Sequence, residues 1–280
     1  MMLRRFYDWL TKGHGSTRPL GLFRIMLVIL LWTRFAGDLA LWNATDMVTA
    51  VSGLGLLLLG ALALIGWQTR RVMALLATLM VVVYFHLGIN QNYIPFTHHH
   101  TYLLMVCTAI TAIGPCERSF SLDAWQASNA DRPFTEFGSL APNRLMIVQL
   151  AAIYLWAAVD KTNWVFLSGL RLDQILHLHY FDSPFRSFLL WPPLILALSA
   201  AVVITEYFLA IGVFVKRFLP AVLIVGLIVH GGFFWLLPVQ TFSATMLAMY
   251  IFLFNPRSVH RTCHVLLANA AHREPRSYIP

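Results

Sequence analysis

The chain has 280 residues, of which 59% are hydrophobic and only 11% are charged, and it carries a formal net charge of +8. A soluble domain has about 25% charged residues, so this composition excludes an ordinary soluble protein and indicates a membrane protein with several transmembrane helices. The excess of Lys and Arg is then first a signal of membrane topology, and we expect no nucleic-acid partner.

Apolar segments that are long enough, or nearly long enough, to cross a bilayer recur along the whole chain. From them we predict an all-α fold, a polytopic membrane helix bundle of about eight transmembrane helices. We expect one domain over residues 1–260 and a cytoplasmic tail over residues 261–280, because no repeat or long linker divides the chain. The expected spans, in chain order, are Leu20 to Gly37, Val51 to Trp67, Val72 to Ile89, Thr101 to Pro115, Leu145 to Val159, Pro193 to Val215, Phe218 to Leu237 and Phe242 to Phe254.

Basic residues lie mainly on one side of this predicted bundle. The connections around residues 38–50, 90–100 and 236–241 contain no Lys or Arg, whereas each connection on the other side contains at least two such residues. Cytoplasmic loops carry the excess of Lys and Arg, so we predict that both termini are cytoplasmic. The exception is the outer segment after the fifth span, which contains Lys161, Arg171 and Arg186.

Two further features concern processing and redox state. The first apolar segment is long and lacks a small-residue cleavage pattern, so we predict no cleavable signal peptide. In the predicted topology Cys107 lies within a span, and Cys116 and Cys263 lie at or beyond cytoplasmic ends of spans. No two cysteines then face an oxidising compartment, and we predict no structural disulfide.

Four charged residues lie within or at the edge of apolar segments. Lys161 follows the fifth span, where a charge costs a few kcal/mol unless it is paired, reaches the headgroup layer or serves a function. It is therefore either a snorkelling anchor or a functional residue. Glu206 and Arg24 lie inside the sixth and first spans and must face the interior, where they could pair with each other and fix helix register. Arg34, near the outer end of its span, is expected to snorkel.

Histidines gather at the predicted outer depth of Lys161, which seven of the 11 histidines share. A metal site is one interpretation of such a cluster, but the His-Glu-x-x-His spacing is absent and the outer segments offer no Cys, so we predict no metal. The other interpretation is structural, with polar residues at helix ends and an interhelical contact at His230, where Gly231 and Gly232 would let backbones approach. The seven are His86, His98, His99, His100, His177, His179 and His230.

Several short strings occur in order along the chain. They are Leu-Gly21-Leu-Phe23-Arg24-Ile, His98-His99-His100-Thr101-Tyr102, Ser121-Leu-Asp123-Ala, Tyr154-Leu-Trp-Ala-Ala-Val-Asp160-Lys161-Thr-Asn-Trp164, Ser168-Gly169 and Asp182-Ser183-Pro184-Phe185-Arg186, followed by Glu206 and His230. Taken together, these strings resemble the transmembrane domain of vitamin K-dependent gamma-carboxylases, which their bacterial relatives in the HTTM family share. The resemblance extends over nearly the whole chain and implies a multi-pass protein of a cell membrane, most simply a bacterial inner membrane.

The resemblance implies a quinol site. It makes Lys161 the candidate base that deprotonates a reduced quinone, either reduced vitamin K or a menaquinone-like quinol, before the quinone reacts with oxygen. His100 and His99 would hydrogen-bond the quinone oxygen or the lysine, and His230 would line the reaction chamber. The residues expected to contact the cofactor are Tyr154, Tyr102, Trp164 and His98.

The chain also departs from the carboxylases. They carry a large extramembrane domain after these helices, whereas this chain ends about 25 residues after its last expected span. His99 replaces the family's usual asparagine, and the acidic Asp160 precedes the lysine. We therefore expect membrane lipid as a partner, and a protein or peptide partner in place of the extramembrane domain.

Three functions stay open on the sequence alone. The first is a carboxylase-like enzyme, an epoxidase and carbon–carbon lyase, that acts on an unknown substrate. The second is a non-catalytic membrane module that binds lipid, quinone or a partner in peptide maturation or export. The third is a transporter, for which no inverted repeat or pair of broken helices is visible in the sequence.

Overall fold

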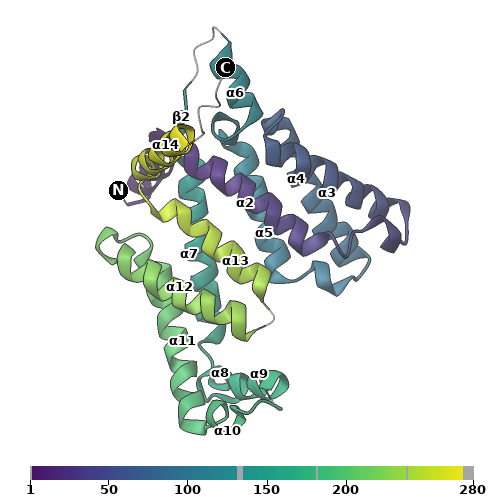
Figure 1. The fold of residues 1–280 in the computed structure, drawn as a ribbon. Helices are drawn as coiled ribbons and strands as arrows, with labels where there is room; N and C mark the ends of the chain where they lie inside the picture. Colours follow the sequence, from purple (N-terminus) through teal and green to yellow (C-terminus); the bar gives the residue numbers. More distant parts are fainter. Residues whose placement is uncertain (1, 131–134, 181, 238, 274–280) are drawn as a thin grey trace. The chain divides into compact units, whose positions relative to one another are not determined.

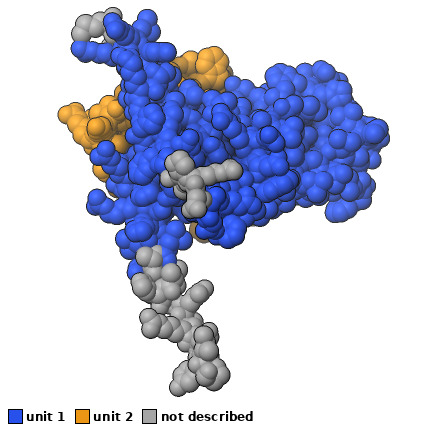
Figure 2. Space-filling view, turned by 90° about the horizontal axis from the view of Figure 1, so that it is seen from above, with its two compact units in different colours: residues 1–146, 248–280 blue, residues 147–247 orange. Residues whose placement is uncertain are grey.

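The structure, a computed structural model, describes residues 2–130, 135–180, 182–237 and 239–273 (Figure 1). The chain divides into two compact units, distinguished by colour in Figure 2: unit 1 comprises residues 1–146 and 248–280, and unit 2 comprises residues 147–247. The predicted boundary between residues 260 and 261 stays a prediction, and both residues lie inside the last helix.

Nearly all of the described chain is helical, in agreement with the predicted all-α fold. The α-helices are α1 (Met2–Thr11), α2 (Arg18–Phe35), α3 (Met47–Ile65), α4 (Thr69–Val81), α5 (His99–Ile113), α6 (Leu122–Asn129), α7 (Ala141–Lys161), α8 (Trp164–Leu167), α9 (Leu170–Tyr180), α10 (Arg186–Leu189), α11 (Pro192–Gly212), α12 (Leu219–Leu236), α13 (Gln240–Met249) and α14 (Pro256–Arg273). A π-helical segment, Val82–Asn90, continues α4, and the 3₁₀ segments are Leu41–Asn43, Ile94–Phe96, Cys116–Arg118, Lys216–Phe218 and Tyr250–Leu253. The strands are β1 (His14–Ser16) and β2 (Phe137–Ser139).

Five helical segments in the described chain are long and apolar enough to cross a membrane, and they indicate a membrane protein. Each coincides with one of the expected spans. Long apolar side chains such as Leu58 on α3 and Ile228 on α12 are exposed on these segments, as contact with lipid requires. The five segments are Met47–Ile65, Thr69–Asn90, Ala141–Lys161, Pro192–Gly212 and Lys216–Leu236.

The other three expected spans are helical but less suited to crossing a bilayer. The apolar helices at His99–Ile113 and Gln240–Leu253 are shorter than the five long segments. Helix α2 has 18 residues but includes Arg18, Arg24 and Arg34. The coarse prediction of a helical membrane protein is thus supported, whereas eight spans and cytoplasmic termini stay predictions.

Within unit 1, α2 packs against α3 and α5, and α4 packs between α3 and α5 (Figure 1). Phe23, Leu27 and Leu31 have no accessible surface, so one face of α2 is buried along the helix, whereas Ile29 on another face is exposed. The spacing of four residues places these three buried side chains on one face of the helix.

A two-stranded antiparallel sheet, which the sequence did not predict, joins the N-terminal segment to the segment before α7. Strands β1 and β2 pair with Gly15 opposite Gly138. A Cβ atom on Gly138 would lie 3.0 Å from Pro115 Cγ, so the close approach of this strand requires glycine. The strands have three residues each, too few to give an alternating apolar pattern.

The most deeply buried charge in unit 1 is Arg24. Its side chain has no accessible surface, and its guanidinium donates hydrogen bonds to the carbonyl oxygen of Cys116, at 2.8 Å, and to that of Phe120. Phe120 has a left-handed backbone conformation with a φ of 54°, which orients the turn after α5. The predicted pair of Arg24 with Glu206 is therefore wrong, because backbone carbonyl oxygens, and not a carboxylate, accept from Arg24.

The same turn connects α3 to α4. Gly66 ends α3 with a φ of 74°, and a Cβ atom there would lie 2.3 Å from Ser121 Cβ. The Asp123 carboxylate accepts hydrogen bonds from the backbone N–H groups of Gln68, at 2.9 Å, and Thr69, at 2.7 Å, and so caps the start of α4 from a distant part of the chain. These residues hold the ends of α2, α3, α4 and α5 together.

Within unit 2, three short helices follow α7 and pack beside the N-terminal part of α11 (Figure 1). Asn163 caps α8, because its side-chain oxygen accepts a hydrogen bond from the Phe166 backbone N–H at 3.0 Å. Gly169 has a φ of 85°, and a Cβ atom there would lie 2.8 Å from Ile195 Cγ2. The segment after Lys161 thus folds against α11.

We predict that Arg24→Met lowers the free energy of unfolding by roughly 3 kcal/mol, because two buried carbonyl oxygens lose hydrogen bonds from a charged donor. Thermal unfolding in detergent measures the effect. Arg4→Gln, at an exposed position on α1, is the matched control and should leave the melting temperature unchanged. Equal melting temperatures for Arg24→Met and the control would contradict the assigned role of Arg24.

Candidate functional site

The eight residues that the sequence singled out fall into two sets, one in each unit. Unit 2 contains Lys161, Trp164, Tyr154 and His230, and the structure joins two of these in one hydrogen bond. Unit 1 contains His98, His99, His100 and Tyr102.

The centre of the unit 2 set is an ion pair between Lys161 and Glu206. Lys161 Nζ donates to Glu206 Oε1 at 2.8 Å and to Oε2 at 3.1 Å, and it lies 3.4 Å from the carbonyl oxygen of Ala157. The side chain of Glu206 is 9% exposed and that of Lys161 is 27% exposed. The carboxylate is therefore enclosed, and the ammonium group remains accessible from one side.

The position of the pair follows from the stagger of two candidate spans. Lys161 is the last residue of α7, whereas Glu206 follows the first residue of α11 by 14 positions, which is about 21 Å along the axis. The end of α7 therefore lies beside the interior of α11 rather than beside its first turn. A carboxylate in the interior of an apolar helix needs a cation, and the end of α7 supplies it.

This geometry gives Lys161 a partner that the sequence did not predict. The sequence suggested Lys161 alone as the base, with Glu206 as a structural residue that pairs with Arg24. In the structure Glu206 holds Lys161 through both carboxylate oxygens, so the two residues form one hydrogen-bonded unit. No sequence pattern links the two residues, because their contact depends on the stagger of separate helices.

One aromatic ring, that of Phe166, lies near the ammonium group of Lys161. Its Nζ lies 5.9 Å from the centre of the Phe166 ring, a distance at which a cation is attracted to the ring face. Trp164, on the first turn of α8, is 82% exposed. Phe166 was not predicted as a site residue, and its only sequence signal is its place two positions after Trp164.

The second polar contact in unit 2 joins α7 to α12. Tyr154 Oη and His230 Nε2 are 2.6 Å apart, and both side chains are buried. This contact agrees with the interhelical interpretation of His230. The close approach expected at the following glycines is not seen, because a Cβ atom placed on Gly231 or Gly232 would have no heavy atom of another described helix within 4 Å.

In unit 1 the three consecutive histidines begin α5, and Arg34 holds the third. Arg34 Nε donates to His100 Nε2 at 2.9 Å, and its two other nitrogens donate to Asp38 Oδ2 at 2.7 Å and to the Pro95 carbonyl at 2.6 Å. Arg34 therefore does not snorkel, since it is fixed in a network. Because His100 Nε2 accepts this bond, the proton on the ring is at Nδ1.

The other unit 1 candidates lie around His100. The rings of His98 and His99 lie 5.3 Å and 5.6 Å from that of His100. Tyr102 is half exposed, and its ring lies 5.9 Å from that of Tyr84 in the π-helical segment. Segments of this kind occur often at functional sites.

Neither metals nor known relatives add to this description. No group of three or more His, Cys, Asp or Glu side chains in the described parts of the chain is arranged to hold a metal ion. All three cysteines are free. No family model, curated protein or solved structure matches the chain.

We predict that the Lys161 and Glu206 substitutions are strongly coupled. Lys161→Met alone should cost about 3 kcal/mol, because it leaves an enclosed carboxylate without its cation, and Glu206→Leu alone should cost a similar amount. The double variant should cost less than the sum of the two, because neither charge is left unpaired.

Thermal or denaturant unfolding of the four proteins in detergent measures this coupling. Lys216→Gln, at an exposed position after the end of α11, provides the control and should not couple with Glu206→Leu. Additive effects of Lys161→Met and Glu206→Leu would show that the ion pair does not form.

Proposed function

We propose that this chain is an integral membrane protein in which the Lys161–Glu206 pair takes up a proton from a lipid quinol, in a site similar to that of the vitamin K-dependent gamma-carboxylases. The observation that carries the proposal is a hydrogen-bonded Lys–Glu pair between two helices that are each able to cross a membrane. Ionisable pairs at membrane depth are costly, and they commonly mark proton relays and substrate pathways.

The residues around the pair fit a quinol headgroup. Such a ring has two flat apolar faces and a hydroxyl group at each end, so it needs aromatic or aliphatic walls and one polar group that handles a proton. Phe166 provides an aromatic ring beside Lys161, and Trp164, on the first turn of the same helix, is an exposed aromatic residue. A bound quinol supplies the phenolic proton and the reducing equivalents for reaction with oxygen.

Lys161 and Glu206 together can accept a proton from the quinol, which charged Lys161 alone cannot do. An ammonium group cannot accept a proton, so Lys161 in its charged form is no base. The Glu206 carboxylate can accept a proton. Lys161 Nζ gives a proton to Glu206 Oε1, and Nζ then accepts the phenolic proton of the quinol. The net change is one proton on Glu206, and Lys161 is an ammonium group before and after the transfer. This relay needs the 2.8 Å hydrogen bond that joins Nζ to Oε1.

We also propose a membrane arrangement for this function. It consists of about eight spans, two cytoplasmic termini and placement in a bacterial inner membrane, as a member of the HTTM type. The asymmetric distribution of Lys and Arg and the five long apolar segments support it. The substrate on which the oxidised quinol chemistry acts is unassigned.

We predict that the purified protein in lipid nanodiscs consumes oxygen when reduced menaquinone or reduced vitamin K is supplied. Lys161→Ala and Glu206→Gln should each lower this rate at least about a hundredfold, because each removes one half of the proton relay. An oxygen electrode measures the rate, and loss of quinol absorbance gives an independent measure.

Lys216→Gln is the matched control and should retain the wild-type rate, because Lys216 is exposed and lies outside the pair. Equal oxygen uptake by Lys161→Ala and the wild type would overturn the proposal. Quinone binding without oxygen uptake by the wild type would also overturn it, in favour of a non-catalytic module.

A further inference from the structure

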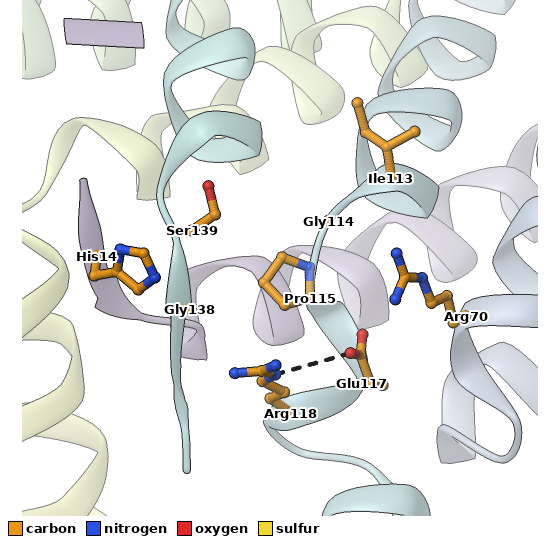
Figure 3. Close-up of a pocket in the computed structure, with 9 residues that line it drawn as sticks. All are labelled: His14, Arg70, Ile113, Gly114, Pro115, Glu117, Arg118, Gly138 and Ser139. Carbon is orange, nitrogen blue, oxygen red and sulfur yellow. Dashed lines mark ion pairs between the residues drawn. The ribbon is translucent and has the colours of Figure 1, made fainter. Parts of the chain in front are cut away.

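A second polar site lies in unit 1, at one end of two apolar helices. A pocket of about 250 Å³ opens where α5 ends and α4 begins (Figure 3). Strands β1 and β2 form its other wall. The residues that line it are His14, Arg70, Ile113, Gly114, Pro115, Glu117, Arg118, Gly138 and Ser139.

Two arginines and a carboxylate line the pocket. Arg70 and Arg118 flank Glu117 in the close-up view (Figure 3). Arg118 Nη1 donates to the Phe137 carbonyl at 2.7 Å, which fixes this guanidinium at the pocket wall. Arg70 has neither a hydrogen bond nor an ion pair with the described part of the chain, and its side chain is exposed. Two guanidinium groups in one small pocket are a receptor for an oxyanion such as phosphate.

A simple anion bound by the two arginines would leave the Glu117 carboxylate without a hydrogen-bond donor. Its Oε2 atom is buried and has no hydrogen-bond partner among the described residues, and its Oε1 atom lies 3.9 Å from Arg118 Nε, beyond hydrogen-bond distance. A carboxylate with so few donors is rare in a folded protein and calls for one more. A ligand that satisfies all three side chains has an anionic group and a hydrogen-bonding cation.

The place of the pocket indicates where such a ligand comes from. Helix α4 begins one of the five candidate spans at Thr69, and it packs against α5, which ends at Ile113. The exposed Ile113 side chain lies at the apolar helix end, next to the charged groups. If α4 crosses the bilayer, its first turn lies where hydrocarbon gives way to headgroups.

We propose that this pocket binds a phosphate–ammonium zwitterion, the phosphoethanolamine headgroup of a membrane lipid. Arg70 and Arg118 bind the phosphate, and Glu117 accepts hydrogen bonds from the primary ammonium group. A phosphocholine headgroup fits less well, because its quaternary ammonium has no N–H to donate. A phosphoglycerol headgroup has no cation for Glu117.

Native mass spectrometry of the purified full chain with defined lipids tests the proposal. The probes are dioleoyl phosphatidylethanolamine, phosphatidylglycerol and phosphatidylcholine at equal concentration, and the wild type should retain the ethanolamine lipid most strongly. Arg70→Gln should weaken its retention roughly tenfold, because a charge-assisted hydrogen bond to phosphate is lost. Arg70 has no structural contact to lose, so this variant should fold as the wild type does.

Two further variants separate this site from general attraction between lipid and basic residues. Arg71→Gln removes the adjacent exposed arginine, which does not line the pocket, and should leave lipid retention unchanged. Glu117→Gln should abolish the preference for ethanolamine over glycerol headgroups. Equal losses for Arg70→Gln and Arg71→Gln, or an unchanged headgroup preference in Glu117→Gln, would overturn the proposal.

Soluble O-phosphoethanolamine, added to the protein in detergent, distinguishes a lipid from a free ligand. We expect thermal stabilisation by the lipid at far lower concentration than by the soluble headgroup. Equal stabilisation by both at equal concentration would support the pocket and assign it to a soluble phosphate–ammonium compound. Stabilisation by inorganic phosphate that equals that of either zwitterion would overturn the role of Glu117.

Discussion

The constraint on which the structure depends is that a charged side chain inside an apolar helix must find a partner. Arg24 finds two backbone carbonyl oxygens at the turn after α5, and Glu206 finds Lys161 at the end of α7. Arg34 finds a carboxylate, a carbonyl oxygen and an imidazole. Each of these contacts fixes the position of one helix against another segment, which apolar side chains alone would leave free to slide.

The residues that resemble those of the carboxylases are of two kinds: those that join helix ends, and those around the Lys161–Glu206 pair. Gly21, Arg24, Ser121 and Asp123 belong to one joint: a Cβ atom on Gly21 would lie 2.6 Å from the Ser119 carbonyl oxygen, and Asp123 caps α4. In this chain these residues hold helix ends together, and they take no part in the Lys161–Glu206 contact. The functional proposal therefore depends on the second kind, the Lys161 string together with Glu206.

Sequence reasoning located the long apolar helices and the charged residues within them, but neither the polar helices, such as α1 and α14, nor the partners of the charged residues. The five long apolar segments coincide with predicted spans because composition and length are local properties. The Lys161–Glu206 contact spans 45 positions and depends on the stagger of α7 and α11, for which no local signal exists. For the same reason the pairing of Arg24 with Glu206 was a wrong prediction. The short sheet was missed because its pairing depends on two facing glycines rather than on an apolar pattern.

The most direct test of the central claim is an experimental structure of the protein in lipid nanodiscs that contain reduced menaquinone, with a bound antibody fragment to add mass. The account predicts density for a flat ring with a polyprenyl tail beside Lys161, with a ring oxygen within hydrogen-bond distance of Nζ and with the Lys161–Glu206 contact retained. A well-resolved quinone at another place in the protein, with acyl chains against Lys161, would contradict it.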